Sequence, residues 1–155
     1  MLKRVLIANR GEIALRVIRA CRELDIETVA VYSTADENSL AAQLATRSLC
    51  IGPARAADSY LNQEALLSAA KAAGCDAVHP GYGFLSENPE FADRVVAAGL
   101  KYIGPSGDVI RRMGSKAAAR TLAQKAGVPV VPGSDGPLKN IRQAKQLAAK
   151  VGYPV

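Results

Sequence analysis

The clearest structural signal near the start of the sequence is Val5-Leu6-Ile7-Ala8-Asn9-Arg10-Gly11-Glu12-Ile13. Its first four residues are a continuous apolar run, which is typical of a strand buried on both faces of a parallel sheet. Residues 11–23 then carry apolar side chains at helical spacing, namely Ile13, Leu15, Val17, Ile18 and Cys21. A buried strand, a short turn and an amphipathic helix predict the first unit of an α/β fold.

The same alternation continues along the chain to about residue 103. Apolar and β-branched runs predict strands at 28–32, 48–51, 77–79 and 101–103, with helices at 40–45, 62–73 and 89–98 between them. Asn88 and Pro89 suit a helix start, while Gly74 and Gly99 suit helix ends. Short connections in this order predict an open, mostly parallel, Rossmann-like sheet with helices on both faces.

The pattern changes after residues 104–106. Helices are predicted at 108–113, 115–126 and 141–150, with a proline-interrupted extended stretch at 128–133. Residues 152–155 are typical of the beginning of another strand. We therefore expect a first domain over residues 1–113 and an incomplete second domain over residues 114–155.

Composition argues against several classes of protein. The 155 residues carry a formal net charge of +6 at pH 7, yet the basic residues are scattered and aromatic residues are few, which predicts no nucleic-acid partner. No apolar stretch approaches the length of a membrane span, and the first apolar run is too short for a signal peptide. We expect a cytoplasmic protein that does not bind a membrane.

The cysteines and the single histidine do not suggest a metal site. Cys21, Cys50 and Cys75 are odd in number and widely spaced, so we expect buried, reduced thiols rather than disulfides or zinc ligands. His79 is the only histidine, and we expect a strand-end residue bonded to the backbone.

Two turns are candidates for ligand binding. The first strand-to-helix turn lacks the three glycines of a dinucleotide fingerprint, so an NAD enzyme is disfavoured. The turn at residues 79–88 follows a strand, where open α/β sheets bind ligands, although Gly81 and Gly83 are equally consistent with a tight structural turn.

Several charged residues can be interpreted either as ordinary surface residues or as functional ones. Arg10 and Arg16 suit an anion, although exposed arginines more often bind nothing specific. Arg19 and Glu23 lie one helical turn apart and would form a weak local ion pair. Lys116, at the start of a predicted helix, adds a positive charge to amides that suit a phosphate.

Four segments, taken together in their order and spacing, closely resemble biotin carboxylases. They are Ile7-Ala8-Asn9-Arg10-Gly11-Glu12-Ile13-Ala14, His79-Pro80-Gly81-Tyr82-Gly83-Phe84-Leu85-Ser86-Glu87-Asn88, Ile103-Gly104-Pro105 and Val131-Pro132-Gly133-Ser134. The resemblance spans the whole chain, although residues 40–47 depart from the family pattern. It implies a biotin carboxylase N-terminal domain over 1–113, followed by the beginning of an ATP-grasp domain.

The resemblance implies the chemistry of an ATP-dependent ligase. With Mg²⁺ or Mn²⁺, ATP activates bicarbonate to carboxyphosphate, and biotin on a biotin carboxyl carrier protein is then carboxylated. A partner carboxyltransferase passes the group to acetyl-CoA or another acyl-CoA, and the carboxylase itself forms a homodimer. The catalytic residues and metal ligands of the family are expected beyond Val155, so we expect this chain to be inactive alone.

Matching positions imply roles for six residues. Lys116 matches the first ATP-contacting lysine of the family. Tyr82 and Gly83, with Arg16 nearby, match biotin-side positions of the active site. Arg19 and Glu23 match positions in the family's dimer interface.

Two alternatives stay open from the sequence. Another ATP-grasp ligase would share the architecture but should lack the segments around Arg10 and residues 81–88, and it would turn over without biotin. A non-catalytic binding or dimerisation module is favoured if the chain is complete at Val155.

Overall fold

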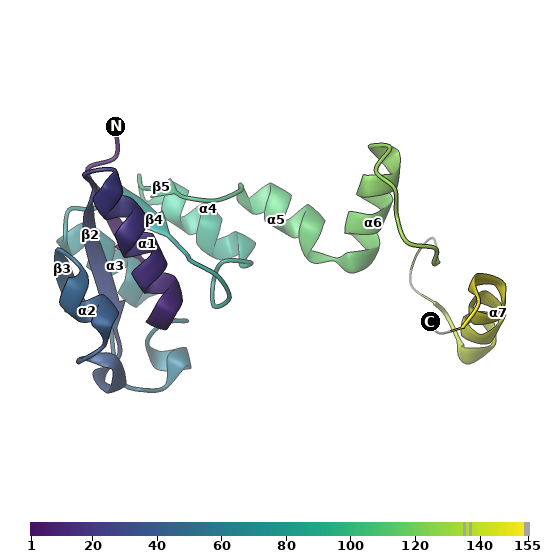
Figure 1. Cartoon of the computed structure of the whole chain (residues 1–155), viewed down its shortest axis with the longest axis horizontal. Coiled ribbons are helices and arrows are strands. Elements are labelled where there is room, and N and C mark those ends of the chain that lie inside the picture. Colours follow the sequence, from purple (N-terminus) through teal and green to yellow (C-terminus); the bar gives the residue numbers. More distant parts are fainter. Residues whose placement is uncertain (135, 137, 154–155) are drawn as a thin grey trace. The chain divides into compact units, whose positions relative to one another are not determined.

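Five parallel strands form one sheet in the order β3-β2-β1-β4-β5 (Figure 1). The computed structural model describes residues 1–134, 136 and 138–153. The strands are β1 (Arg4–Ile7), β2 (Glu27–Tyr32), β3 (Arg47–Cys50), β4 (Ala77–His79) and β5 (Lys101–Tyr102). All neighbouring pairs run parallel, so the predicted Rossmann-like α/β fold is confirmed.

The helices lie close to their predicted positions. They are α1 (Gly11–Glu23), α2 (Leu40–Leu44), α3 (Gln63–Ala72), α4 (Pro89–Ala97), α5 (Gly107–Gly114), α6 (Lys116–Lys125) and α7 (Ile141–Val151). Two short 3₁₀ turns, Thr34–Asp36 and Ala56–Asp58, were not predicted. They follow β2 and β3, where polar and proline-containing segments carry no helical periodicity.

Helices cover both faces of the sheet. Successive side chains of β1 point to opposite faces, so they pack against different helices. Leu6 packs in a cluster with Leu66 of α3 and Phe91 of α4. Ile7 packs in a separate cluster with Ala14 and Ile18 of α1, and Ala41 of α2 joins this cluster. Leu6 and Ile7 are both fully buried, which explains the continuous apolar run in the sequence.

Asparagine side chains begin α3 and α4, as Asn88 was predicted to do for α4. Asn88 Oδ1 accepts a hydrogen bond from Phe91 N at 2.9 Å, and Pro89 is the first helical residue. Asn62 caps α3 in the same way, at 3.1 Å from Ala65 N. The N-terminal ends of α3 and α4 are therefore each stabilised by an asparagine cap.

The chain divides into two compact units, residues 1–110 and 111–155. The division falls within α5, as does the domain boundary expected near residue 113. In the second unit, none of the described residues is buried, and Val131, Ile141 and Tyr153 are each at least 75% exposed. Gly152 and Tyr153 are not in a strand, and the rest of the strand expected at 152–155 lies outside the described residues.

The expectation that all three cysteines are buried was wrong for Cys50. Cys21 and Cys75 are buried and free, whereas the free thiol of Cys50 is exposed. Cys50 ends β3, which lies at an edge of the sheet and exposes Arg47 and Ser48 as well. No helix in the described part of the chain is long and apolar enough to cross a membrane.

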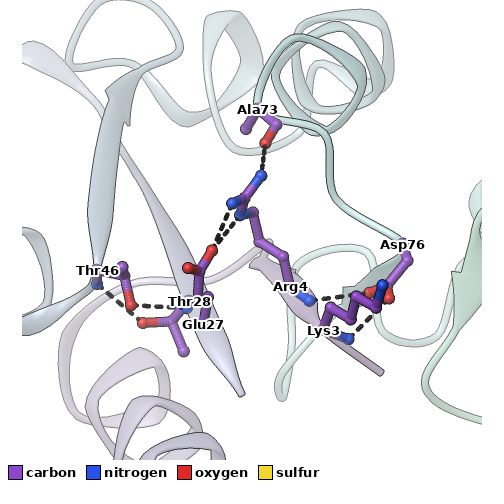
Figure 2. Close-up of polar contacts among 7 residues, drawn as sticks. All are labelled: Lys3, Arg4, Glu27, Thr28, Thr46, Ala73 and Asp76. Atoms are coloured by element: carbon purple, nitrogen blue, oxygen red, sulfur yellow. Dashed lines mark hydrogen bonds and ion pairs between the residues drawn. The ribbon is translucent and has the colours of Figure 1, made fainter. Parts of the chain in front are cut away.

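Arg4 ties together the amino-terminal ends of three strands (Figure 2). Its Nε donates to Glu27 Oε2 of β2 at 2.6 Å, and its Nη1 donates to Ala73 O at 2.7 Å, at the end of the helix α3 that precedes β4. The Asp76 carboxylate accepts from the backbone amides of Lys3 and Arg4 at 2.8 and 3.1 Å. Although partial burial raises the pKa of Asp76, these amide hydrogen bonds outweigh it and the pKa is lowered overall.

We expect Arg4→Met to lower the free energy of unfolding of the chain by about 1 kcal/mol, because two side-chain hydrogen bonds are lost. Urea unfolding followed by circular dichroism measures the change. Lys3→Met is the matched control, because Lys3 contributes only its backbone amide to Asp76. Equal stability of the two variants would contradict a role of the Arg4 side chain in joining the strands.

Candidate functional site

The sheet has its topological switch point between β1 and β4. From β1 the chain continues to β2 and β3 on one side, whereas β4 and β5 lie on the other. The turn after β1 and the loop after β4 therefore leave the sheet side by side, joined where Ala8 N donates to His79 O at 2.9 Å. Open α/β sheets bind their ligands at such a point, at the carboxyl ends of the strands.

Asn9 holds the loop after β4 against the turn after β1. Its side-chain Nδ2 donates to both Pro80 O and Tyr82 O, at 2.9 and 2.8 Å. Its Oδ1 accepts from the backbone amide of Arg10 at 3.0 Å, and Asn9 itself is only 3% exposed. A Cβ on Gly81 would lie 2.6 Å from Asn9 Nδ2, so this close approach requires the glycine that the loop contains.

The residues that follow in the loop differ in how they are held. Tyr82 is 77% exposed. A Cβ on Gly83 would meet no atom within 4 Å, so the backbone is open there. Phe84 has a φ of +45°, which is uncommon for a residue with a Cβ, and its ring stacks on Tyr60 with centroids 5.3 Å apart. Tyr82 and Gly83 are thus presented between two held positions.

A polar cluster supports this stacked pair. The Arg10 guanidinium lies 5.8 Å from the Tyr60 ring centroid and 5.9 Å from that of Phe84. Arg10 Nη1 is 3.6 Å from Asp36 Oδ1. Asp36 Oδ2 accepts from Tyr60 OH at 2.7 Å and from Ser33 Oγ at 2.8 Å. Arg10, a candidate anion ligand from the sequence, is therefore already paired with a carboxylate.

The cluster keeps one charge state at neutral pH. Burial, and then the hydrogen bond to Asp36, raise the pKa of Tyr60 to about 12, so its hydroxyl stays protonated. Burial alone would raise the pKa of Asp36. Hydrogen bonds from Tyr60 and Ser33 and the charge of Arg10 outweigh this effect, so the pKa is lowered overall. A protonated phenol, a carboxylate and a guanidinium are the forms that these contacts require.

Comparison with known families identifies the fold. Residues 1–110 match the family described as biotin carboxylase, N-terminal domain. The chain belongs to this family. Residues 115–155 match the family described as carbamoyl-phosphate synthase L chain, ATP binding domain. The resemblance of the whole chain to biotin carboxylases is confirmed.

Individual relatives agree with this assignment. Biotin carboxylase of Haemophilus influenzae is 57% identical over 156 residues, covering 100% of this chain and 35% of that protein. Biotin carboxylase of Campylobacter jejuni, solved as a complex with β-γ-ATP, superposes with a TM-score of 0.92 at 48% identity, covering 99% of this chain and 34% of that one.

A third relative was solved with ligands and as a dimer. The biotin carboxylase domain dimer of Hydrogenobacter thermophilus 2-oxoglutarate carboxylase, in complex with MgADP, ADP and bicarbonate, superposes with a TM-score of 0.90 at 48% identity. The match covers 99% of this chain and 34% of that one. The chain thus spans about a third of the length of the relatives it matches.

The residues implied by the biotin carboxylase resemblance occupy different places. Tyr82 and Gly83 lie in the loop that Asn9 holds. Arg16, Arg19 and Glu23 are exposed on α1, and these described side chains form no hydrogen bond or ion pair with one another. The local Arg19–Glu23 ion pair suggested by the sequence is therefore absent.

Lys116 is the first residue of α6, in the second unit, and is exposed. Ser115 caps the helix by accepting from Ala118 N at 3.4 Å. The amides of the first turn and the lysine charge suit a phosphate group. Within the described residues no three His, Cys, Asp or Glu side chains gather into a possible metal site, so the location of metal ligands beyond Val155 stays a prediction.

Sequence reasoning missed Asn9, Asp36 and Tyr60 as parts of one cluster. A signal was present for Asn9, because a polar residue directly after the buried apolar run of residues 5–8 needs hydrogen-bond partners. Asp36 and Tyr60 lie 24 residues apart, and nothing in the local pattern connects them.

His79 gives the loop a pH dependence. Its Nδ1 accepts from Gly81 N at 3.0 Å, as expected of a strand-end residue bonded to the backbone, and this bond requires the neutral imidazole. Burial lowers the pKa of His79 below its ordinary value of 6.5. His79 therefore binds a proton less readily in the folded state than in the unfolded state. As a result, the free energy of unfolding decreases as the pH falls below about 6.5.

We expect the free energy of unfolding of the chain to decrease from pH 7 to pH 5, and this decrease to be much smaller in His79→Asn. The asparagine Oδ1 replaces Nδ1 as an acceptor but does not titrate. Chemical unfolding at several pH values measures both. No other histidine titrates in this range, so an equal pH dependence in the variant would contradict the assignment.

Proposed function

We propose that this chain is the N-terminal part of a cytoplasmic biotin carboxylase, which uses ATP and bicarbonate to carboxylate biotin on a biotin carboxyl carrier protein. A partner carboxyltransferase then passes the carboxyl group to an acyl-CoA or a similar acceptor. The observation that carries the proposal is the match of residues 1–110 to the biotin carboxylase N-terminal domain, with high identity to named biotin carboxylases along the whole chain.

The loop after β4 is proposed to meet biotin. It leaves the sheet at the switch point, where ligands bind in this class of fold. Tyr82 offers an exposed ring, and the open space at Gly83 lets a ligand approach the backbone closely. Arg16, exposed on α1, would add a positive charge on the biotin side.

Lys116 is proposed to contact ATP. An exposed ammonium group at the first residue of α6 adds a full charge to the partial positive charge of the helix start. Phosphate oxygens are the matching ligand for this pair of features. ATP supplies the energy for activating bicarbonate, and Mg²⁺ or Mn²⁺ would neutralise charge on its phosphates.

The exposed face of α1 is proposed as part of a homodimer interface. Arg19 and Glu23 are both exposed, and neither is paired with the other within the described chain. Opposite charges on one helix suit a two-fold interface, where each can meet its counterpart on the second copy. The similar Hydrogenobacter thermophilus domain was solved as a dimer.

In the full-length protein that contains this chain, we expect ATP hydrolysis that requires both biotin and bicarbonate. Lys116→Ala should raise the KM for ATP about 10-fold or more, because a charge-assisted phosphate contact is lost. Steady-state ADP release measures both quantities. Lys125→Ala is the control, since Lys125 is also exposed and lies at the other end of α6. Hydrolysis without biotin would instead favour another ATP-grasp ligase.

Arg19→Glu should weaken the dimer of the full-length protein about 10-fold or more, because like charges would then meet at the interface. Sedimentation velocity over a range of concentrations measures the dissociation constant. Arg55→Glu, at another exposed arginine outside α1, should leave it unchanged. A dimer unaffected by Arg19→Glu would exclude this face of α1 as the interface.

A further inference from the structure

We propose that Asn9, together with the Arg10–Asp36–Tyr60 cluster, positions the loop after β4 so that Tyr82 and Gly83 are held in place for biotin. This inference rests on the proposed function and assigns positioning roles to residues that do not themselves touch the substrate. It concerns only the first unit of the chain, residues 1–110.

The first hold on the loop is a backbone clamp. Asn9 uses both hydrogens of its side-chain amide, one on Pro80 O and one on Tyr82 O. Between these carbonyls lies Gly81, with a φ of +72° and no room for a Cβ beside Asn9. Since the acceptor side of Asn9 is fixed by Arg10 N, the amide cannot turn without losing all three bonds. The curvature of the loop before Tyr82 is therefore set by one buried side chain.

The second hold lies directly after Gly83. Phe84 has a positive φ, a backbone conformation that carries strain for a side chain with a Cβ. Its ring lies nearly parallel to that of Tyr60, with an interplanar angle of 10°, and the Arg10 guanidinium lies near both rings. These contacts keep Phe84 in a conformation that the isolated loop would rarely adopt.

The cluster links this second hold to the ends of β1 and β2. Tyr60 is 1% exposed, and its hydroxyl both donates to Asp36 and accepts from Ser33 N at 3.1 Å. Asp36 also pairs with Arg10, which follows Asn9 directly in the chain. The clamp and the stacked ring are thus parts of one connected set of contacts.

The two holds bracket Tyr82 and Gly83. The Tyr82 side chain is exposed and Gly83 has none, so neither residue can fix the loop by packing into the core. Their placement depends on the hydrogen bonds of Asn9 on one side and on the stacking of Phe84 against Tyr60 on the other. A change that weakens those contacts should disturb biotin binding while leaving ATP binding, assigned to the second unit, unaffected.

The decisive variant is Asn9→Asp in the full-length protein. Aspartate has nearly the same shape but offers no hydrogens, so its carboxylate would face two carbonyl oxygens. We expect the KM for biotin to rise at least 10-fold, the KM for ATP to stay within twofold, and amide hydrogen exchange in residues 81–86 to become faster.

Asn88→Asp is the matched control, because it makes the same change of charge at the end of the same loop. Asn88 acts only as an acceptor toward Phe91 N, and aspartate caps a helix equally well. Its KM for biotin should stay within twofold of the wild-type value.

Tyr60→Phe tests the second hold by a milder change. It keeps the stacked ring but removes the hydroxyl between Asp36 and Ser33. We expect a rise of about threefold in the KM for biotin, so the proposal stays testable even if Asn9→Asp fails to fold.

The outcomes separate the two proposals. Biotin-dependent hydrolysis in the wild type with an unchanged KM for biotin in both variants would overturn the positioning role alone. An equal rise in the KM for ATP and for biotin would overturn it too, because it would indicate a general loss of structure. Absence of biotin-dependent hydrolysis in the wild type would overturn the proposed function, and the biotin-side role with it.

Discussion

The parallel pairing of β1 along both of its edges organises the whole first unit of the chain. β1 pairs with β2 on one side and with β4 on the other, and its apolar side chains are fully buried on both faces. Because the chain leaves β1 and β4 toward opposite halves of the sheet, their following turns open side by side. The contact between Asn9 and the loop that contains Tyr82 is a geometric result of this strand order.

Charged and polar side chains act differently at the two ends of the strands. At the amino-terminal end, Arg4 and Asp76 form hydrogen bonds with neighbouring strands and with backbone groups (Figure 2). These bonds join parts of the sheet to one another. At the carboxyl end, Asn9 and Arg10 bond instead to a loop and to its aromatic support. The contacts at the amino-terminal ends therefore fix the strands, while those at the carboxyl ends fix the loop after β4.

The fold was predictable because its signals are local. The apolar run of β1, the asparagine at the start of α4 and the glycines after α3 and α4 each specify one element. The loop position was predictable from the general rule for open sheets. The cluster around Asp36 was not, since its partners come from separate segments and meet only in the folded sheet. Cys50 was misjudged because a short apolar run does not reveal that its strand lies at an edge.

The position of β1 also determines the order in which the sheet can be assembled. Of the five strands of this sheet, β1 comes before the others in the chain, and the residues that Asn9 binds lie 71 and 73 positions after Asn9. Contacts so distant in sequence slow folding, because much chain must be ordered before they form. Until β4 has been made, one edge of β1 offers unpaired amides and carbonyls to any other strand. β1 is thus fully paired only after β4 has been made, and until then its free edge can pair with a wrong strand during synthesis.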